Sequence, residues 1–486
     1  MDSDRVRDLV EVALRALQVG GERRAGGPAP AVEPGELARL VRAALAEPAG
    51  ILPATGGGDA PALAELTEVF AGGAVDPAHP LAAAHLHCPP LPVAVAADMV
   101  AGLLNQSVDS WDQGPAAITV EREVVRALAA LAGLDSERAG GAITTGGSES
   151  NLMGLLLARE VGHRTVICSE HAHFSVQRAA ATLGLGSGAV MIVPADDRHR
   201  LDPAALVAAL TGLPRGSATV VATAGTTGTG SIDPLPAIAD LTAEHRAWLH
   251  VDAAYGGGAL FSDRLAPLLA GLERADSIAL DLHKIGWQPV PAGVFLAADE
   301  RSFAPLELNA GYLNPVDDEA AGYAGLLGRS LRTTRRADSF KIAVTLRAVG
   351  RTGLGTRLDR CHDLARYAAA RISGHPRLRL NAQPVLTTVV FRYAAAAEPD
   401  RINAELRRAL LRGGQAVVGR TELEGAVWLR LTLLNPNATE PDIDTLLAAV
   451  VAAGDTVVAT PIPDPAPDPA PGPAPGPAAR ARAMPS

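Results

Sequence analysis

Four polar side chains in this chain each follow an apolar run of the kind that forms a buried strand. They are His173 after Thr165–Ser169, Thr227 after Thr219–Thr223, Asp252 after Trp248–Val251, and Lys284 after Ser277–Leu280. A lysine in such a setting is unusual, because burial of the ammonium is costly and favours a neutral or covalently bound amine. Amines of this kind form Schiff bases with carbonyl compounds. A lone lysine would more often be an ordinary surface residue, so the neighbours of Lys284 decide its interpretation.

A glycine-rich loop between a strand pattern and an apolar helix pattern is the second chemical feature. It reads Thr144-Thr145-Gly146-Gly147-Ser148. Free amide groups at a helix N-terminus, small residues and hydroxyl donors together form an anion seat suited to phosphate. The alternative is an ordinary capped helix that starts at Ser148 and Glu149.

These features are connected by a regular alternation of strands and helices. Further strand patterns occupy 190–193 and 293–297, and helix patterns occupy 93–108, 119–131, 175–183, 203–210 and 234–245. Such alternation predicts a largely parallel α/β sheet that is covered on both faces. Ligands of these sheets bind beyond the carboxyl ends of the strands. The lysine, the acid, the imidazole and the phosphate seat are therefore expected on one rim of one sheet.

Together these groups predict a site for pyridoxal 5'-phosphate (PLP). Lys284 would hold the aldehyde covalently, and Asp252 would keep the pyridine nitrogen protonated so that the ring accepts electrons. His173 would stack on the ring. The Gly146-Gly147-Ser148 loop would hold the phosphate.

Five motifs, in this order, resemble the group II PLP-dependent amino acid decarboxylases: TTGGSESNL, SEHAHFSV, GTTGTGSID, WLHVDAAYGG and ADSIALDLHK. The resemblance covers about residues 75 to 350 and is closest to the L-2,4-diaminobutyrate/lysine decarboxylase-like branch. It implies the PLP-dependent transferase type I (aspartate aminotransferase-like) fold, with a mostly parallel seven-stranded sheet and a smaller C-terminal α/β domain. It also implies a homodimer with active sites at the interface. Ala254 would pack on the ring face opposite His173, Thr227 would approach the ring oxygen, and His283 would lie beside the phosphate.

By the same resemblance, the chain is a decarboxylase that releases carbon dioxide from an amino acid and leaves an amine. In the aromatic-type relatives a flap tyrosine donates the proton to Cα, but the corresponding position here is near Leu326. Tyr323, three residues away, or His173 is expected to donate instead. Two other interpretations are an aminotransferase, which would retain the carboxylate, and a protein that binds PLP without catalysis. The stacking His173 favours decarboxylation.

The substrate pocket is expected to include His87, Cys88, Asp109 and Arg336. Asp109 stands where the aromatic branch carries an aromatic residue, and a carboxylate there would pair with a distal ammonium. A basic diamino acid such as L-2,4-diaminobutyrate is therefore the expected substrate. The alternative is an aromatic or acidic amino acid (tyrosine, aspartate or glutamate), with Asp109 an unpaired loop acid.

The composition of the chain limits which binding partners and which cellular compartment are expected. The formal charge of −10 and the pI near 5.7 argue against a nucleic-acid partner. No apolar run approaches the roughly 20 residues of a membrane span. The three cysteines are far apart and odd in number, which fits a reducing compartment, so a cytoplasmic protein is expected. His85, His87 and Cys88 suggest a metal site, but further ligands at zinc-like spacing are missing, so no metal is predicted.

Changes in pattern divide the chain into four expected regions. These are a helical arm at 1–78, a large PLP-binding domain at 79–345, a small C-terminal domain at 346–456 and a Pro/Ala-rich disordered tail at 457–486. The arm carries helix patterns at 4–18 and 36–46, and it either clasps a second subunit or is a frayed end. The stretch 311–336 lacks clean periodicity and is expected to be a functional flap.

Overall fold

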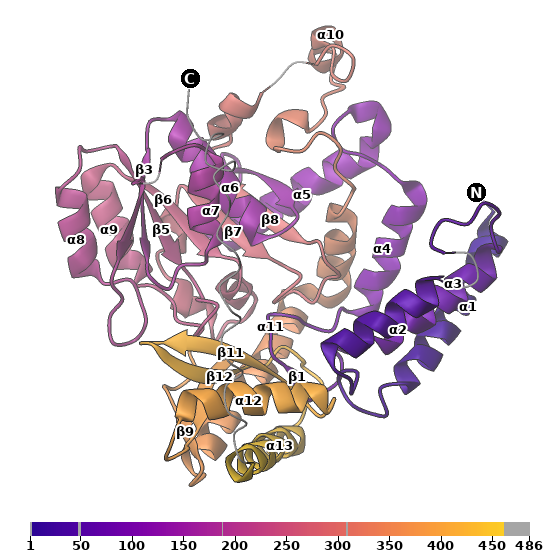
Figure 1. Ribbon diagram of the computed structural model, residues 1–486. Helices are drawn as coiled ribbons and strands as arrows, with labels where there is room; N and C mark the ends of the chain where they lie inside the picture. Colours follow the sequence, from indigo (N-terminus) through magenta and orange to yellow (C-terminus); the bar gives the residue numbers. More distant parts are fainter. Residues whose placement is uncertain (1, 47–49, 187, 308–309, 461–486) are drawn as a thin grey trace, which may run out of the picture.

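The centre of the molecule is a seven-stranded sheet in the order β2-β8-β7-β6-β5-β3-β4 (Figure 1). The computed structural model describes residues 2–46, 50–186, 188–307 and 310–460, so most of the expected tail lies outside it. The strands are β2 Gly140–Thr144, β3 Thr165–Ser169, β4 Val190–Val193, β5 Ala218–Thr223, β6 Trp248–Ala253, β7 Ser277–Asp281 and β8 Gly293–Ala297. Within the described sheet, β8 alone runs antiparallel to its neighbours. The predicted mostly parallel, seven-stranded sheet is confirmed.

Both faces of this sheet are covered, and every residue of its central strands β5 and β6 is buried, including two threonines, His250 and Asp252. Helices α6 and α7 pack on one face, where Leu155 and Val176 meet Val166, Cys168 and Val221. Helices α5, α8, α9 and the first part of α11 contribute to the core on the other face. Their bounds are α5 Pro115–Leu131, α6 Gly147–Glu160, α7 Ser175–Thr182, α8 Pro203–Thr211, α9 Leu235–His245 and α11 Ser339–Ser373.

A second sheet, in the order β1-β11-β12-β10-β9, forms the smaller layer below the first in Figure 1. Its elements are β1 Ala82–Ala83, β9 Leu378–Leu380, β10 Thr388–Tyr393, β11 Val417–Leu423 and β12 Ala426–Thr432, with helices α12 Pro399–Arg412 and α13 Glu440–Ala459. β1 lies just before His85, His87 and Cys88 in the chain, and it pairs in parallel with β11. A strand of only two residues can form at this edge of the sheet, because the prolines that follow it in the chain lie outside the paired residues.

One long helix connects the two layers. Within α11 the backbone bends at Gly350, whose φ of +68° falls in the left-handed region that favours glycine. Leu354 and Leu358 beyond the bend still pack in the core of the large sheet. From Leu364 onward the same helix packs in the core of the small sheet. The expected boundary at residue 345 lies five residues before this break in the helical backbone.

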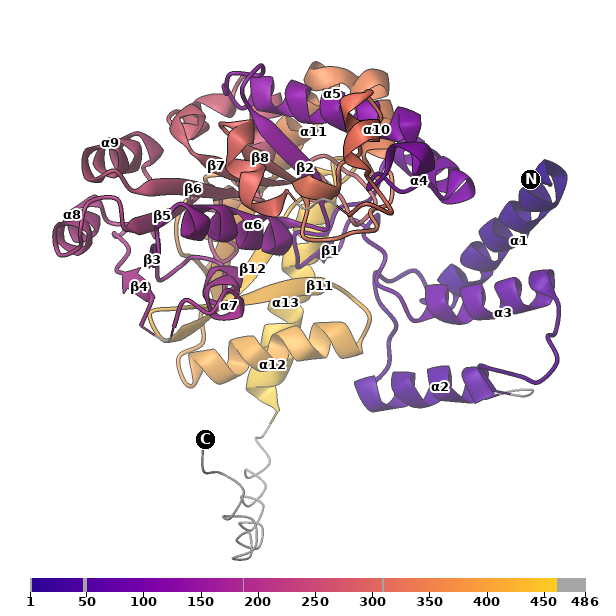
Figure 2. The ribbon, with the colours of Figure 1, turned by 90° about the horizontal axis from the view of Figure 1, so that it is seen from above.

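The N-terminal arm consists of three helices that stand beside the body of the molecule (Figure 2). They are α1 Ser3–Glu22, α2 Pro34–Ala46 and α3 Asp59–Gly72, of which α3 was not predicted. α1 and α3 pack closely at Gly20, where an added Cβ would lie 2.5 Å from the carbonyl oxygen of Glu68. The arm also exposes apolar side chains, including Phe70, which is 78% exposed.

The remaining elements connect the arm to the large domain and shape the flap, residues 311–336. Helix α4 (Pro92–Leu104) ends before the predicted residue 108 because Asn105 adopts a left-handed φ of +47° and caps it. The flap contains the short helix α10 (Val316–Ala320) and the 3-10 turn η6 (Leu327–Arg329). Other short turns are η1 Trp111–Gln113, η2 Gly256–Phe261, η3 Ala266–Leu269, η4 Leu272–Arg274 and η5 Glu300–Leu306. None of the described helices combines the length and apolarity needed to cross a bilayer.

Candidate active site

A cavity of about 290 Å³ opens at the carboxyl ends of β3, β5, β6 and β7. All nine residues that were expected to contact the cofactor line it: Gly146, Gly147, Ser148, His173, Thr227, Asp252, Ala254, His283 and Lys284. Thr145, Asn151, Thr223, Gly225, Tyr255 and Asp281 complete the lining. The topology brings them together because each follows a strand of one parallel sheet.

The loop before α6 forms a cup of small residues. Gly146 has a φ of +152°, and α6 starts at Gly147 without a side-chain cap on its first amide groups. An added Cβ on Gly147 would lie 2.8 Å from the Cβ of Ala254, so the loop and the β6 end are in close contact. Uncapped amides at a helix N-terminus are suited to an anion. We call residues 145–148 the phosphate cup.

Lys284 follows β7 in a short turn and is paired with an acid that sequence reasoning missed. Its Nζ donates to the Oδ2 of Asp281 at 2.8 Å, and His283 Nε2 lies 3.6 Å from the same oxygen. Burial lowers the pKa of His283. The Oδ1 atom of Asp281 is buried without a hydrogen-bond partner in the described structure. The sequence feature that could have identified Asp281 is its position at the end of a strand pattern, three residues before the lysine.

Asp252 is held by a buried network whose other members were also missed. Asn151 Nδ2 donates to Asp252 Oδ2 at 2.8 Å, and Asn151 Oδ1 lies 2.9 Å from His250 Nε2. The other ring nitrogen of His250 shares a 2.8 Å hydrogen bond with the hydroxyl of Ser277. Burial lowers the pKa of His250 to about 4, so its imidazole is neutral at neutral pH. A neutral, fully bonded network fixes one carboxylate oxygen of Asp252 in place.

His173 stands on the loop after β3 and faces into the cavity. Its Nδ1 shares a 2.8 Å hydrogen bond with the hydroxyl of Ser175, which in turn accepts from Asn151 at 2.9 Å. Burial is the largest influence on the pKa of His173 and lowers it, while the nearby Asp252 opposes that shift. The imidazole is thereby connected to the network that holds Asp252.

The residues present fit PLP. Two buried polar atoms in the cavity, Asp281 Oδ1 and Thr223 Oγ1, lack partners in the described structure, and the cup presents free amides. A lysine amine lies within reach of the cavity, and a fixed carboxylate lies on the neighbouring strand β6. This is the donor set for a phosphorylated aldehyde with a basic ring nitrogen. Among the described residues, no three His, Cys, Asp or Glu side chains gather as metal ligands would.

Of the residues expected to bind substrate or donate the proton, His173 lines this cavity, whereas Asp109, Arg336 and Tyr323 do not. Asp109 is buried, and its carboxylate accepts from the hydroxyl of Ser107. Arg336 donates to Asp98 and Asp338 at 2.7 and 2.6 Å, which uses its guanidinium in ion pairs between α4 and the start of α11. Tyr323 packs edge-on against Trp111 with ring centroids 4.9 Å apart.

The segment with His87 and Cys88 lies closer to the lysine loop. Cys88 is buried, and its thiol donates to the carbonyl oxygen of His283 at 3.3 Å. His87 is exposed to solvent. Cys88 therefore supports the backbone next to Lys284, and neither residue lines the cavity around the lysine.

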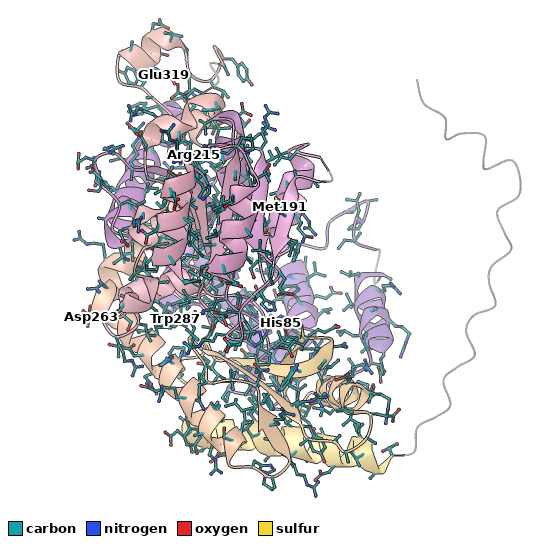
Figure 3. The ribbon with its side chains drawn as sticks, turned by 90° about the vertical axis from the view of Figure 1, so that its left-hand side faces the viewer. His85, Met191, Arg215, Asp263, Trp287 and Glu319 are labelled. Carbon is teal, nitrogen blue, oxygen red and sulfur yellow. The ribbon has the colours of Figure 1, made fainter. Side chains whose placement is uncertain are left out.

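Arg430 and Trp287 are among the residues that attach the small domain to this site. Arg430 on β12 donates to the carbonyl oxygens of Thr227 and Ala84 at 2.5 and 3.1 Å. Trp287, three residues after the lysine, is fully buried and donates through its indole to the carbonyl oxygen of Leu434 at 2.9 Å. Figure 3 shows Trp287 and His85 at the level where the two layers meet. Arg430 was not predicted, because it contacts the site only through tertiary structure.

Comparison with known proteins agrees with this geometry. Residues 79–394 match the pyridoxal-dependent decarboxylase conserved domain. The chain is 45% identical to an L-2,4-diaminobutyrate decarboxylase of Rhizobium meliloti (strain 1021) over 413 residues, 82% of this chain and 83% of the relative. It is 35% identical to a protein of the same name from Acinetobacter baumannii over 428 residues, 81% of this chain and 84% of the relative.

Solved structures agree in fold. The glutamate decarboxylase domain of diaminobutyrate-pyruvate transaminase and L-2,4-diaminobutyrate decarboxylase from Vibrio parahaemolyticus has a TM-score of 0.81 at 32% identity, with 94% of this chain and 96% of that chain covered. The Oryza sativa protein TDC, solved with PLP and tryptamine, has a TM-score of 0.85 at 25% identity, with 94% and 99% covered. The predicted type I fold is confirmed, and the chain belongs to the pyridoxal-dependent decarboxylase family, whose cofactor is PLP and whose members are carboxy-lyases.

Proposed function

We propose that this enzyme decarboxylates a basic diamino acid, with L-2,4-diaminobutyrate as the first candidate. The observation that carries the proposal is the 45% identity to the Rhizobium meliloti L-2,4-diaminobutyrate decarboxylase over most of both chains. The Acinetobacter baumannii relative supports the same substrate. The products would be carbon dioxide and the corresponding diamine.

The pocket residues are assigned roles from their positions. Bound PLP supplies an aldehyde and an electron-accepting pyridine ring. Lys284 holds the aldehyde carbon covalently, and Asp252 binds the proton on the ring nitrogen. Asn151 keeps Asp252 aimed through their 2.8 Å hydrogen bond. His173 and Ala254 cover the two ring faces and exclude water from them.

The phosphate cup and two further residues complete the cofactor assignment. The amides of Gly147 and Ser148 donate to the phosphate, with His283 beside it. Thr227 approaches the ring oxygen, and its own carbonyl oxygen is fixed by Arg430. These residues would hold the cofactor in one orientation in the cavity and so position the bound substrate.

The proton that replaces carbon dioxide at Cα is assigned to Tyr323, with His173 as the second candidate. Tyr323 lies on the flap and is 48% exposed, outside the cavity of its own chain. His173 lies inside that cavity. Replacement of each residue by a side chain without an ionisable group, Tyr323→Phe and His173→Gln, separates the candidates by which variant loses amine formation.

We further propose a cytoplasmic homodimer in which Asp109 and Tyr323 of one subunit serve the pocket of the other. The support is that neither residue lines the cavity of its own chain, while Phe70 of the arm and Tyr312 of the flap are 78% and 86% exposed. Large exposed apolar side chains favour contact with a partner. Because Asp109 is 3% exposed in its own chain, its carboxylate would pair with the distal ammonium of the substrate only after its loop rearranges at the interface.

Subunit mixing tests the shared site. Lys284→Ala and Tyr323→Phe each make an inactive homodimer if Tyr323 acts across the interface. A mixture that exchanges subunits then regains activity, because one hybrid pocket carries both native residues. A mixture without recovered activity, or a monomeric mass by light scattering, contradicts the shared site.

Carbon dioxide release across a substrate panel tests the function. The panel contains 2,4-diaminobutyrate, ornithine, lysine, glutamate, aspartate and the aromatic amino acids, and the first is expected to have the highest kcat/KM. Preference for an aromatic or acidic substrate would support that alternative and contradict the assignment of Asp109. Glutamate formation from 2-oxoglutarate without carbon dioxide would indicate an aminotransferase.

A further inference from the structure

The C-terminal end of the flap is attached to the large domain by three arginines, each bound to a carboxylate. Arg332 Nε donates to Glu149 at 2.8 Å, Arg335 donates to Glu121 at 2.6 Å, and Arg336 donates to Asp98 at 2.7 Å. Arg335 and Glu121 are both 2% exposed in their side chains. The end of an otherwise irregular segment is therefore fixed at three points.

Two of these arginines meet at one carbonyl group of β2. Arg332 Nη2 and Arg335 Nη1 donate to the oxygen of Ile143 at 3.3 and 3.2 Å. The amide group of Ile143 itself donates to Glu121 at 3.2 Å. β2 lies at the edge of the described sheet, so its outer peptide groups have no strand partner and need other ones. The flap supplies the partners of the Ile143 carbonyl and α5 supplies the partner of its amide, one residue before β2 ends and the phosphate cup begins.

Glu149 connects this attachment to the cup itself. Its Oε2 accepts from the amide and the hydroxyl of Thr145 at 2.7 and 2.8 Å, while its Oε1 accepts from Arg332. The side chain of Glu149 is only 11% exposed. Thr145 lines the cofactor cavity, but Arg332 does not. The carboxylate of Glu149 is thus hydrogen-bonded through Oε2 to Thr145, which lines the cavity, and through Oε1 to Arg332 of the flap.

We propose that Glu149 is a positioning residue that couples cofactor binding to the order of the flap. A phosphate in the cup fixes the Thr145–Gly147 backbone, which holds Glu149 in the orientation that Arg332 needs. An attached Arg332 in turn holds Glu149 where it orients Thr145. Coupling between two sites is reciprocal, so each event strengthens the other by the same factor. The inference rests on the proposed phosphate cup.

The test measures PLP affinity and flap protection in the full-length apoprotein. Arg332→Ala removes the flap side of the link and leaves the cup residues untouched, so the PLP dissociation constant is expected to rise about tenfold. Saturating PLP is expected to slow cleavage by an acid-specific protease at Asp317, Asp318 and Glu319 in the wild type, and to do so far less in the variant. Arg332→Lys, which keeps the charge, is expected to recover part of both effects.

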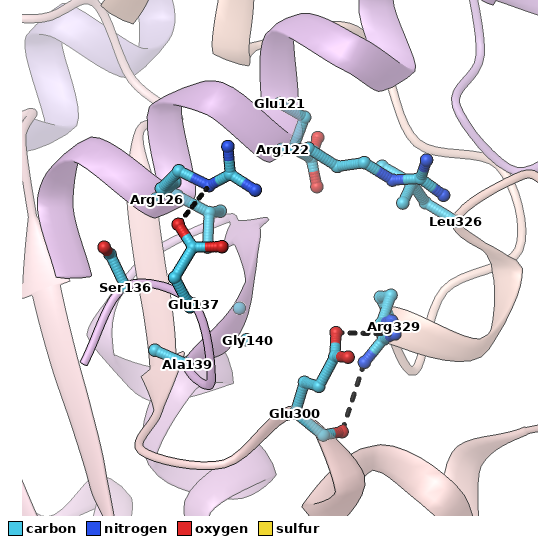
Figure 4. Close-up of a pocket in the computed structure, with 12 residues that line it drawn as sticks. Glu121, Arg122, Arg126, Ser136, Glu137, Ala139, Gly140, Glu300, Leu326 and Arg329 are labelled. Carbon is cyan, nitrogen blue, oxygen red and sulfur yellow. Dashed lines mark hydrogen bonds and ion pairs between the residues drawn. The ribbon is translucent and has the colours of Figure 1, made fainter. Parts of the chain in front are cut away.

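Arg329→Ala is the matched control. Arg329 also lies at the flap end, but it contacts Glu300 at 3.4 Å beside a separate cavity of about 210 Å³ on the outer side of β2 (Figure 4). The side chain of Glu300 is 57% exposed, and neither residue contacts the cup. PLP affinity and flap protection are therefore expected to stay within twofold of the wild type.

A double-mutant comparison tests the same link with a second substitution, at Glu149. Glu149→Gln keeps an oxygen that can accept from Thr145 but loses the charged bond to Arg332, and Glu149→Gln with Arg332→Ala is expected to cost no more than either change alone. Additive losses, or wild-type affinity and PLP-dependent protection in Arg332→Ala, would overturn the proposal. A wild-type protein that failed to bind PLP would instead refute the cup.

Discussion

Asn151 donates a 2.8 Å hydrogen bond to Asp252, and this contact joins α6 to the end of β6 beside the cavity of the candidate active site. Asn151 is 1% exposed and Asp252 is 6% exposed. The amide of Asn151 also contacts His250 and Ser175, so one side chain orients the acid and connects it to the loop that carries His173.

Replacement of Asn151 should therefore impair catalysis. Asn151→Ala leaves Asp252 Oδ2 and His250 Nε2 without their hydrogen-bond partner, and a buried unsatisfied group costs about 1–3 kcal/mol. We expect kcat/KM for carbon dioxide release to fall about tenfold or more. Asn403→Ala is the control, because Asn403 is an equally buried asparagine that bonds Tyr393 in the small domain. It should lower stability without this loss in kcat/KM per folded molecule.

His250 should make stability depend on pH. Its pKa is lowered to about 4 by burial, whereas the unfolded chain titrates near the ordinary 6.5. Between these values the unfolded chain binds a proton that the native protein does not, so the free energy of unfolding falls as the pH falls from 6.5 towards 4. The contribution is fully present above pH 6.5.

Urea unfolding from pH 4.5 to 7 measures this effect. In His250→Gln the slope against pH should be smaller by up to about 1.4 kcal/mol per pH unit, the value for one proton. Other histidines titrate in both proteins and cancel in the difference. Equal slopes in the two proteins would contradict the assignment.

A methyl group in the phosphate cup should block the cofactor. The Cβ of Gly147→Ala would lie 2.8 Å from the Cβ of Ala254 and 3.3 Å from the carboxylate of Asp281, so the loop must move. We expect the PLP dissociation constant, measured from cofactor absorbance, to rise about tenfold or more. Gly188→Ala serves as control because an added Cβ there meets nothing within 4 Å. Unchanged affinity in Gly147→Ala would place the phosphate elsewhere.

The three thiols should be unreactive in the native protein. Cys88, Cys168 and Cys361 are buried, and burial raises the pKa of each thiol to about 12. Only the thiolate is nucleophilic, so iodoacetamide at pH 8 should leave the folded protein unmodified. In urea, mass spectrometry should find three alkylated cysteines. Rapid native labelling of Cys88 would show that the segment beside His283 opens.

Much of the large domain could be predicted because its strands are buried on both faces. The bounds of β3 and β8 match their predicted runs residue for residue, since a strand covered on both sides leaves an uninterrupted pattern, and the bounds of the partly exposed edge strand β4 match as well. The residues that line the cavity could be located because a parallel sheet places strand ends on one rim. The order of strands and helices along the chain was enough to predict that Lys284 and Asp252 lie close together.

The contacts that support these residues could not be predicted in the same way. Asn151, His250 and Asp281 lie within ordinary strand and helix patterns, and their importance comes from neighbours distant in sequence. β1 is only two residues long and exists because β11 pairs with it. The arm helix α3 has a weak apolar periodicity, and the flap has almost none, so local pattern gave little guidance there.

The bond from Trp287 to Leu434 has a consequence for protein engineering. The lysine turn depends on a carbonyl group from near the end of the described chain, and Thr227 depends likewise on Arg430. The catalytic half is therefore not a transferable module. A chimaera that joins this large domain to the C-terminal third of a distant relative must keep the carbonyl position of residue 434 and an arginine at residue 430, or the grafted enzyme will have a displaced lysine turn.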